Sequence, residues 1–285
     1  MWPICLLFNK ILKTEDEREL KGENLSAIET YLLQHSSCNI DSHPPSLRRS
    51  LFIDVPHINQ IYTWDCGLAC VVMVLKTIGV NNFDIEALAE LCCTNSIWTV
   101  DLAYLLQRFS VAFSYFTVTF GANPNYCGES FYKEELPNDL ARVDMLFQDA
   151  VEAGIDIQCR SISEEEISFL ILSGKYIAIA LVDHNKLRFC CSHAWQDFHV
   201  PGVLSSNSEY TGHYVLICGF DAGADMFEIR DPASSRKHKR ISSKSLEEAR
   251  KAFGTDEDIL LISLEKSKND HQPSLQLPIN SNSDS

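Results

Sequence analysis

Residues 60–79 read "QIYTWDCGLACVVMVLKTIG", and this stretch decides both the fold and the candidate chemistry. The Trp64-Asp65 pair interrupts an extended segment, and from Cys66 onward apolar side chains recur at helical spacing up to Gly79. We therefore predict a helix that begins at Cys66. The first turn of a helix has unpaired backbone N–H groups that favour a thiolate, so Cys66 is either a packed core residue or an activated thiol.

The sequence around this helix alternates between helical and strand patterns. Helices dominate the first half and strands the second, so we predict an α+β domain in which a helical lobe packs on a mostly antiparallel sheet. Two capping boxes, Ser163 with Glu166 and Ser245 with Glu248, mark the starts of two helices. Helical patterns cover 83–92, 99–109, 140–154, 163–174 and 245–254, and strand patterns cover 111–120, 155–162, 176–183, 213–221, 226–231 and 258–264.

The composition divides the chain into three parts. Residues 1–50 join an apolar segment to a polar linker, 51–264 form a single folded domain, and 265–285 have the composition of a disordered tail. The apolar start, "MWPICLLFNKILK", is too short to span a bilayer. We predict that it packs on the domain as a short helix rather than lying in a membrane surface, and that the chain has no transmembrane segment.

Charge and cysteine content narrow the class of protein. The 285 residues include 24 Lys and Arg against 39 Asp and Glu, a formal net charge of −15, and such a field repels nucleic acid and anionic membranes. We expect no nucleic-acid partner. The 11 cysteines are irregularly spaced and include no CxxC pair, which argues against a secreted disulfide framework and against a structural zinc site. A cytoplasmic protein with reduced thiols is the simplest interpretation.

A base and an orienting carboxylate for Cys66 are available further along the chain. His213 opens a buried-looking strand in "GHYVLICGFD", and Asp231 ends the next strand in "FEIRDPAS". Two adjacent antiparallel strands would place the imidazole and the carboxylate within hydrogen-bonding reach. Gln60 is a candidate amide donor to a developing oxyanion, together with the Cys66 backbone N–H. We predict a catalytic set of Cys66, His213, Asp231 and Gln60.

Each of these residues also has a purely structural interpretation. A cysteine on an apolar helix is usually a packing residue, as we expect for Cys70 one turn further on. A histidine before a strand and an Asp-Pro pair at a strand end are commonly structural as well. The catalytic interpretation depends on all four residues standing at element boundaries in this order.

The order Gln, Cys, His, Asp resembles the papain-like superfamily, and most closely its bacteriocin-leader peptidase branch. The resemblance implies a papain-like fold, in which a thiol at the head of a helix faces a histidine on the sheet. The sequence departs from the family at Leu68, where proline is common. The matching motifs are Gln60, Asp65-Cys66-Gly67, Gly212-His213-Tyr214 and Asp231-Pro232.

A second resemblance covers about residues 50–265 and the N-terminus. The stretches "WDCGLAC", "SIWTVDLAYLL", "GHYVLICGFD", "RDPASS" and "FGTDEDILLISL" look like the eukaryotic guanylylate cyclase-domain family. "MWPIC" and "SYFTVTFGANPNY" look like its soluble plant members. The activity that this resemblance implies is conversion of GTP to cyclic GMP and pyrophosphate, with Mg²⁺ as the expected cofactor.

The residues themselves show little of a nucleotide site. No GxxxxGK or GxGxxG loop occurs. Arg230, Arg236 and Lys237 are weak candidates for phosphate contact, and a solvated basic turn is the simpler interpretation of the run that follows Asp231. The carboxylates available to Mg²⁺ are Asp54, Asp65 and Asp231.

A group of histidines and cysteines near the middle of the strand-rich half invites a zinc interpretation. Its spacing fits no closed tetrahedral pattern, so we predict no metal site there. The group consists of His184, His193, His199, Cys190 and Cys191.

Three functions therefore remain open from the sequence. The first is a soluble guanylyl cyclase with GTP as substrate, acting in a cleft lined by the Cys-His-Asp set. The second is a papain-like thiol hydrolase (cysteine peptidase, isopeptidase or amidase) with a peptide or isopeptide substrate. The third is a catalytically silent module that binds a partner through the same cleft. The sequence leaves the oligomeric state open.

Overall fold

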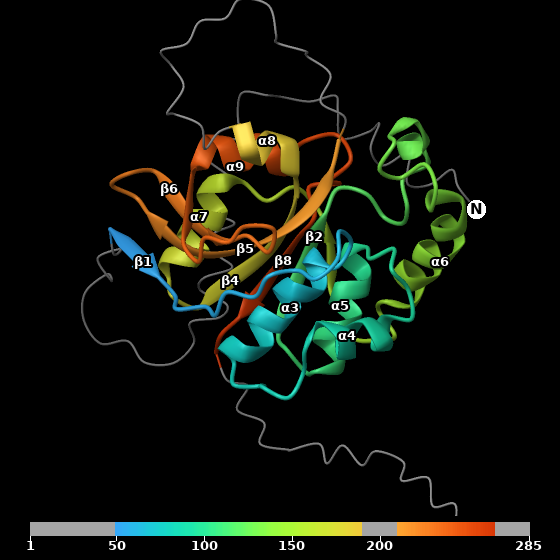
Figure 1. Ribbon diagram of the computed structural model, residues 1–285, viewed down its shortest axis with the longest axis horizontal. Helices are drawn as coiled ribbons and strands as arrows, with labels where there is room; N and C mark the ends of the chain where they lie inside the picture. Colours follow the sequence, from blue (N-terminus) through green and yellow to red (C-terminus); the bar gives the residue numbers. More distant parts are fainter. Residues whose placement is uncertain (1–48, 190–209, 266–285) are drawn as a thin grey trace, which may run out of the picture. The chain divides into compact units, whose positions relative to one another are not determined.

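The computed structural model describes residues 49–189 and 210–265 of the chain (Figure 1). The chain divides into two units, Met1–Ser46 and Leu47–Ser285, and every described residue belongs to the second. Nearly all of the predicted N-terminal segment, linker and tail lies outside the described residues. Within the described ranges, no helix is both long and apolar enough to cross a membrane.

The domain is built on one sheet of eight strands. The strand order is β3-β2-β8-β4-β5-β6-β7, and β1 pairs with β5 off this path. Only the β2–β3 pair is parallel among the described strands, so the predicted α+β class with a mostly antiparallel sheet is confirmed. The strands are β1 (Ser50–Phe52), β2 (Phe113–Thr117), β3 (Ile157–Cys159), β4 (Tyr176–Asp183), β5 (Gly212–Asp221), β6 (Met226–Arg230), β7 (Lys239–Ser242) and β8 (Ile259–Ser263).

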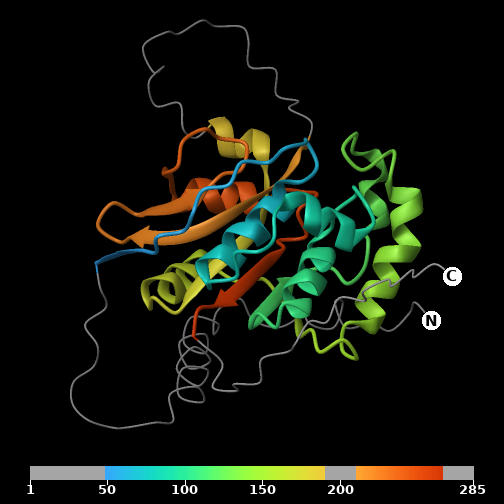
Figure 2. The ribbon, with the colours of Figure 1, turned by 60° about the horizontal axis from the view of Figure 1, so that its bottom comes forward.

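Helices cover both faces of this sheet (Figures 1 and 2). Helices α3, α4 and α5 lie over one face and α7 and α9 over the other, so the expected single helical lobe is only half of the arrangement. The helices are α3 (Cys66–Thr77), α4 (Ile85–Cys92), α5 (Thr99–Arg108), α6 (Leu136–Asp149), α7 (Glu164–Leu172), α8 (His184–Phe189) and α9 (Ser243–Arg250), with a 3₁₀ turn, η1, at Pro124–Gly128.

The two helical layers explain the continuous apolar run of β4. Successive side chains of a strand point to opposite faces, so a strand buried on both faces needs an apolar residue at every position. In β4, Ile177 and Ile179 pack in the core below α3, whereas Ala178 and Ala180 pack in the second core below α7 and α9. The smaller side chains lie on the second face.

The local sequence patterns predicted the first residue of two helices correctly and that of a third helix wrongly. Helix α3 begins at Cys66 as predicted, and the Ser163 hydroxyl accepts the Glu166 N–H at 3.2 Å at the start of α7, also as predicted. The Ser245–Glu248 capping box is wrong. Helix α9 begins at Ser243, because Ser242 at the end of β7 has the extended backbone of an N-cap and accepts the Ser245 N–H.

Candidate functional site

The structure brings Cys66, His213 and Asp231 together. Cys66 is the first residue of α3, His213 is the second residue of β5, and Asp231 follows the last residue of β6. The Cys66 thiol lies near enough to the His213 imidazole to act on its pKa. On the other side of the ring, His213 Nε2 lies 2.8 Å from Asp231 Oδ1. This thiol–imidazole–carboxylate chain is the arrangement that the papain-like resemblance implies.

A helix–strand contact, a strand pairing and a backbone hydrogen bond bring these residues together. Helix α3 packs on β5, which brings the head of the helix to the start of the strand. Strands β5 and β6 are antiparallel, with Leu216 opposite Arg230, so the residue after β6 lies beside the first residues of β5. The segment before α3 is tied to the loop after Asp231, because the Gln60 N–H donates to the Pro232 carbonyl at 3.1 Å.

The carboxylate of Asp231 is fully engaged. Its Oδ1 accepts from His213 and from the Ala233 N–H at 3.0 Å, and its Oδ2 accepts from Lys239 Nζ at 2.8 Å. Burial alone would raise the pKa of Asp231, but the hydrogen bonds and positive charges of His213 and Lys239 hold this pKa well below the ordinary value of 3.8. Asp231 is therefore ionised throughout the physiological range.

The histidine is held in its charged form. Burial alone would lower the pKa of His213, but the hydrogen bonds to Asp231 and Cys66 and the negative charges of those groups raise it from 6.5 to about 9. At neutral pH the ring is therefore an imidazolium, and each of its nitrogens is a donor. Such a ring stabilises negative charge on the sulfur of Cys66, as a catalytic thiol requires.

A second histidine lies against the first. The rings of His184 and His213 stack with their centroids 4.3 Å apart and their planes at 24°. His184 starts α8 directly after β4, and its backbone N–H donates to the Thr211 carbonyl, which fixes it beside the start of β5. One nitrogen or oxygen each from His184, His213 and Asp231 lie within 4.8 Å of one another. Both oxygens of Asp231 are already engaged by His213, Ala233 and Lys239, so the contact between the two histidines in this structure is ring stacking.

The other members of the histidine and cysteine group, for which no metal site was predicted, fall outside the described residues. These are His193, His199, Cys190 and Cys191.

Gln60 is close to the site, but its amide is turned away from the oxyanion role. Its Nε2 donates to the Tyr62 carbonyl at 2.7 Å, and its Oε1 is buried without a hydrogen-bond partner among the described residues. The backbone N–H groups of Ile61 and Tyr62 both donate to the Asp65 carboxylate, which folds this segment into a tight loop before the helix. The Gln60 side chain would have to rotate before its NH₂ could donate to a substrate.

The thiol is only slightly exposed. Cys66 is 5% and His213 is 3% exposed, whereas Cys70, one turn further along α3, is completely buried. Burial, followed by the negative charges of Cys66 and Asp231, raises the pKa of Cys70 well above its usual range, which makes this thiol inert, as predicted. A bulky substrate reaches Cys66 only if the residues that cover it move.

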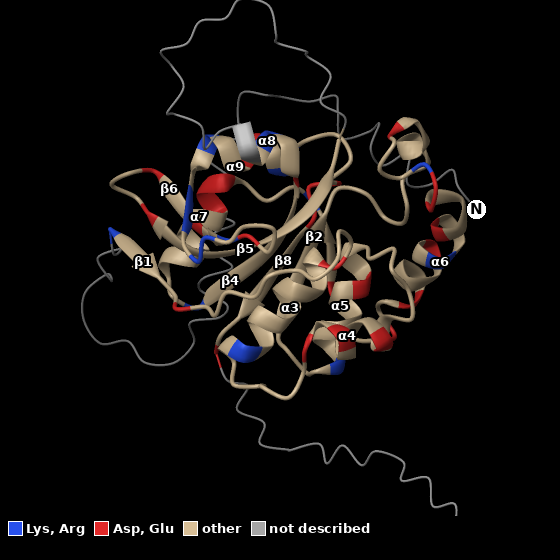
Figure 3. Cartoon of the chain, viewed as in Figure 1, with Lys and Arg blue, Asp and Glu red and all other residues tan. Residues whose placement is uncertain are grey.

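The three weak candidates for phosphate contact differ sharply in access. Arg230 is 1% exposed, its Nη1 pairs with Glu228 at 2.8 Å and its Nε donates to the Val55 carbonyl, so it is not available to a nucleotide. Arg236 and Lys237 are exposed, and Lys237 is only loosely paired with Asp54 at 3.7 Å. Basic side chains gather on β7 and the turn before it, whereas acidic ones spread over α4, α6 and α7 (Figure 3).

The carboxylates considered for Mg²⁺ do not fit the ion. Both oxygens of Asp65 accept backbone N–H groups, and both oxygens of Asp231 are engaged by His213, Ala233 and Lys239. The Asp54 side chain is 90% exposed at the surface. No two of the three share a site among the described contacts.

Gly67, the residue after the thiol, has a packing role. A Cβ at this position would lie 2.9 Å from Leu102 Cδ1 and 3.0 Å from Tyr214 Cδ2. The glycine therefore lets α3 approach α5 and β5 closely enough for Cys66 to reach His213.

Gly67→Ala is expected to lower the free energy of unfolding by about 1 to 2 kcal/mol, because overpacking a filled core forces neighbouring side chains to shift. Urea denaturation of the two proteins measures this difference. Gly128→Ala is the matched control, since a Cβ there meets no atom within 4 Å. Equal losses in both variants would contradict the packing role.

Two residues of the site were not predicted from the sequence. Lys239 lies opposite Ile229 in the β6–β7 pairing and reaches Asp231 from the neighbouring strand. Its only signal was membership of the basic run. His184 was considered only as a metal ligand, and the signal that it faces His213 was its position directly after a buried strand.

Comparisons with known proteins show which family the sequence matches. The sequence model described as guanylylate cyclase matches residues 55–262. The chain is 58% identical over 274 residues to Guanylyl cyclase 1 of Arabidopsis thaliana, covering 94% of this chain and 98% of that protein. Among solved structures it is similar to a C39-like peptidase from Bacillus anthracis, with 12% identity, a TM-score of 0.45, and coverage of 77% of this chain and 99% of the peptidase.

Proposed function

The chain belongs to the guanylylate cyclase family, and from this membership we propose that it converts GTP to cyclic GMP and pyrophosphate. The observation that carries the proposal is the 58% identity to a protein named Guanylyl cyclase 1, over nearly the whole of both chains. In this reaction the ribose 3′ oxygen loses its proton and bonds to the α-phosphorus, while the bond from that phosphorus to the departing pyrophosphate breaks.

We place the reaction beside Cys66 and His213. Every residue of the site lies within the matched range, 55–262. The imidazolium of His213 supplies positive charge for the phosphates, and Arg236 and Lys237 on the following loop supply more. Because the pKa of His213 is about 9, the ring is a poor proton acceptor at neutral pH, so the thiolate of Cys66 is the better candidate to receive the 3′ proton.

The assembled site favours a second activity, thiol-dependent hydrolysis of an amide or isopeptide. In that reaction the Cys66 thiolate attacks the carbonyl carbon, the Cys66 backbone N–H and a rotated Gln60 amide stabilise the oxyanion, and His213 gives its proton to the departing amine. Water then hydrolyses the thioester and restores the thiol. Asp231 orients the imidazole and stabilises its charged form.

Cys66→Ala separates the two activities. If the cyclase proposal is correct, purified protein with GTP and Mg²⁺ forms cyclic GMP, and His213→Gln lowers the rate because it removes the positive charge at the site. Loss of the thiol should lower cyclisation by at most the factor of about 10² to 10⁴ that a proton acceptor contributes, and it should abolish hydrolysis completely because the nucleophile is gone. Cyclic GMP measured by mass spectrometry and release of dye from a peptide amide library are the two readouts.

Cys70→Ala is the matched control, since this buried thiol lies one turn away and has no role in either mechanism. Absence of cyclic GMP in the wild type would refute the cyclase proposal. Absence of both products, with the fold intact, would leave the family member as a binding module.

A further inference from the structure

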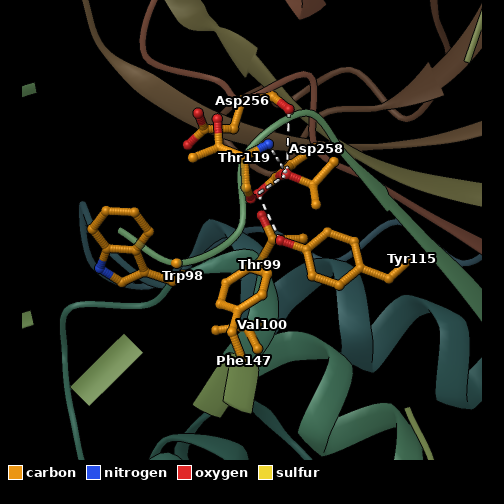
Figure 4. Close-up of a pocket in the computed structure, with 10 residues that line it drawn as sticks. Trp98, Thr99, Val100, Tyr115, Thr119, Phe147, Asp256 and Asp258 are labelled. Atoms are coloured by element: carbon orange, nitrogen blue, oxygen red, sulfur yellow. Dashed lines mark hydrogen bonds between the residues drawn. The ribbon is translucent and has the colours of Figure 1, made fainter. Parts of the chain in front are cut away.

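A second polar pocket lies between α5, β2 and the loop that precedes β8 (Figure 4). Its lining residues pack so closely that no water-sized space remains between them. Three stretches that carry the family resemblance converge here, at residues 96–106, 114–126 and 253–264, although none of them contributes a member of the Cys-His-Asp set. The residues that give the pocket its polar character are Thr99, Tyr115, Thr117, Thr119, Asp256 and Asp258.

Two carboxylates dominate this pocket. Asp256 is 9% and Asp258 is 5% exposed. The Tyr126 hydroxyl donates to Asp256 Oδ1 at 2.6 Å, and the Tyr115 hydroxyl donates to Asp258 Oδ2 at 3.0 Å. The second oxygen of Asp258 is buried and receives no hydrogen bond of ordinary geometry from the described residues. A carboxylate oxygen in this state is an open position for a ligand with positive charge.

The negative charge of the pair is not balanced. Among the described residues, no lysine or arginine forms an ion pair with Asp256 or Asp258, and Arg250 pairs instead with Glu247 and Glu257. Two carboxylates buried together need a proton or a cation, because an uncompensated buried charge is costly.

We propose that this pocket binds a hard divalent cation between Asp256 and Asp258. The donors that surround it are carboxylate, hydroxyl and backbone carbonyl oxygens, including the Thr117 hydroxyl within hydrogen-bonding distance of the Asp256 carbonyl. No sulfur or imidazole lines the pocket, and oxygen-only donor sets select Ca²⁺ or Mg²⁺ over zinc and copper. The space does not admit a water molecule, so the ligand is a bare ion held directly by oxygen atoms rather than a nucleotide.

The cation site is connected to the thiol site by one hydrogen bond. The Thr99 hydroxyl and the Tyr214 hydroxyl lie 2.9 Å apart, and Tyr214 is the residue after His213 on β5. The ring of Tyr214 also packs where a Cβ on Gly67 would lie, next to Cys66. A bound cation would therefore steady the strand and helix that present the thiol and the imidazole.

Terbium(III) luminescence tests the proposal without nucleotide or activity. Tb³⁺ replaces Ca²⁺ at oxygen sites and is excited through adjacent aromatic rings, and Tyr115 and Tyr126 touch the two carboxylates. Wild-type protein should show saturable sensitised emission. Displacement by Ca²⁺ or by Mg²⁺ at the lower concentration identifies the preferred ion. The same ion at about 100 times its Kd should raise Tm by roughly 5 °C.

Asp258→Asn removes one charge with little change in shape. The variant should show neither the sensitised emission nor the rise in Tm on addition of the cation. In EDTA its Tm should equal or exceed that of the wild type, because the repulsion between the two carboxylates is gone. Asp54→Asn, at an exposed carboxylate, is the matched control and should behave as the wild type. If Asp258→Asn does not fold, Asp256→Asn provides the same test.

No saturable emission at millimolar cation, or equal binding by wild type and Asp258→Asn, would overturn the proposal and show that a proton balances the pair. Because the test contains no GTP, its failure is distinct from failure of the cyclase proposal.

Discussion

Asp231→Asn should be less stable than the wild type at pH 6.5, and the difference in free energy of unfolding should shrink by up to about 3 kcal/mol as the pH rises to 9. In the wild type, the pKa of His213 rises from 6.5 to about 9 on folding, so the charged ring stabilises the folded state fully below pH 6.5. That contribution is lost as pH rises through 9. In Asp231→Asn, the effect of burial, which lowers the pKa of His213, is no longer offset by the carboxylate, so the charged ring stabilises the folded state less. Chemical denaturation at several pH values measures the difference between the two proteins.

At acid pH, the contribution of Asp231 to stability changes with pH in the opposite direction. The pKa of Asp231 is lowered on folding, so its contribution is present above pH 3.8 and is lost as pH falls through the folded value. Asp225→Asn is the control, because this carboxylate accepts from the Ser243 hydroxyl and has no histidine partner. A stability difference between wild type and Asp231→Asn that stays constant from pH 6.5 to 9 would contradict the charged state assigned to His213.

Iodoacetamide at pH 7 should modify Cys66 up to about 30 times faster in the wild type than in His213→Ala. An ordinary thiol is only about 3% ionised at pH 7, so the largest possible gain from stabilising the reactive thiolate is about 30-fold. The lower nucleophilicity of a stabilised thiolate reduces the gain, so a factor of about ten is the lower bound of the expectation. Peptide mapping by mass spectrometry, with time points, gives the rate at each cysteine.

The other cysteines provide internal references for this experiment. Cys93 and Cys127 are exposed and should react at the same ordinary rate in both proteins, and Cys70 and Cys218 are buried and should remain unmodified until the protein unfolds. Equal rates at Cys66 in the wild type and in His213→Ala would show that the histidine does not activate the thiol. The thiol hydrolase alternative would then have no nucleophile.

Much of the candidate site could be predicted because each member stands at the end of an element. A helix that starts at Cys66 and strands bounded near His213 and Asp231 follow from local periodicity and from Pro232, and antiparallel pairing of neighbouring strands then joins the histidine to the carboxylate. The orientation of Gln60 could not be predicted in this way. It depends on the Tyr62 carbonyl and on the turn that Asp65 makes, which are details of one loop.

The features that were missed depend on pairing between distant parts of the chain. Strand β8, at the end of the domain, inserts between β2 and β4, and no local pattern specifies that order. This insertion delivers Asp258 to Tyr115, residues that are far apart in sequence. Likewise, the start of α9 could not be chosen among Ser242, Ser243 and Ser245 from sequence, because all three are good caps and only the end of β7 decides between them.

Strand β5 contributes a residue to the thiol site and a residue that contacts the acidic pocket. His213 opposes Val182 and Tyr214 opposes Leu181 in its pairing with β4, so adjacent residues of one strand serve the thiol and the acidic pocket. Sliding this strand by a single position would reverse the side on which each residue faces. We expect an insertion or deletion at the start of β5 to disturb both centres together, whereas a point substitution at His213 or Tyr214 can affect one of them alone.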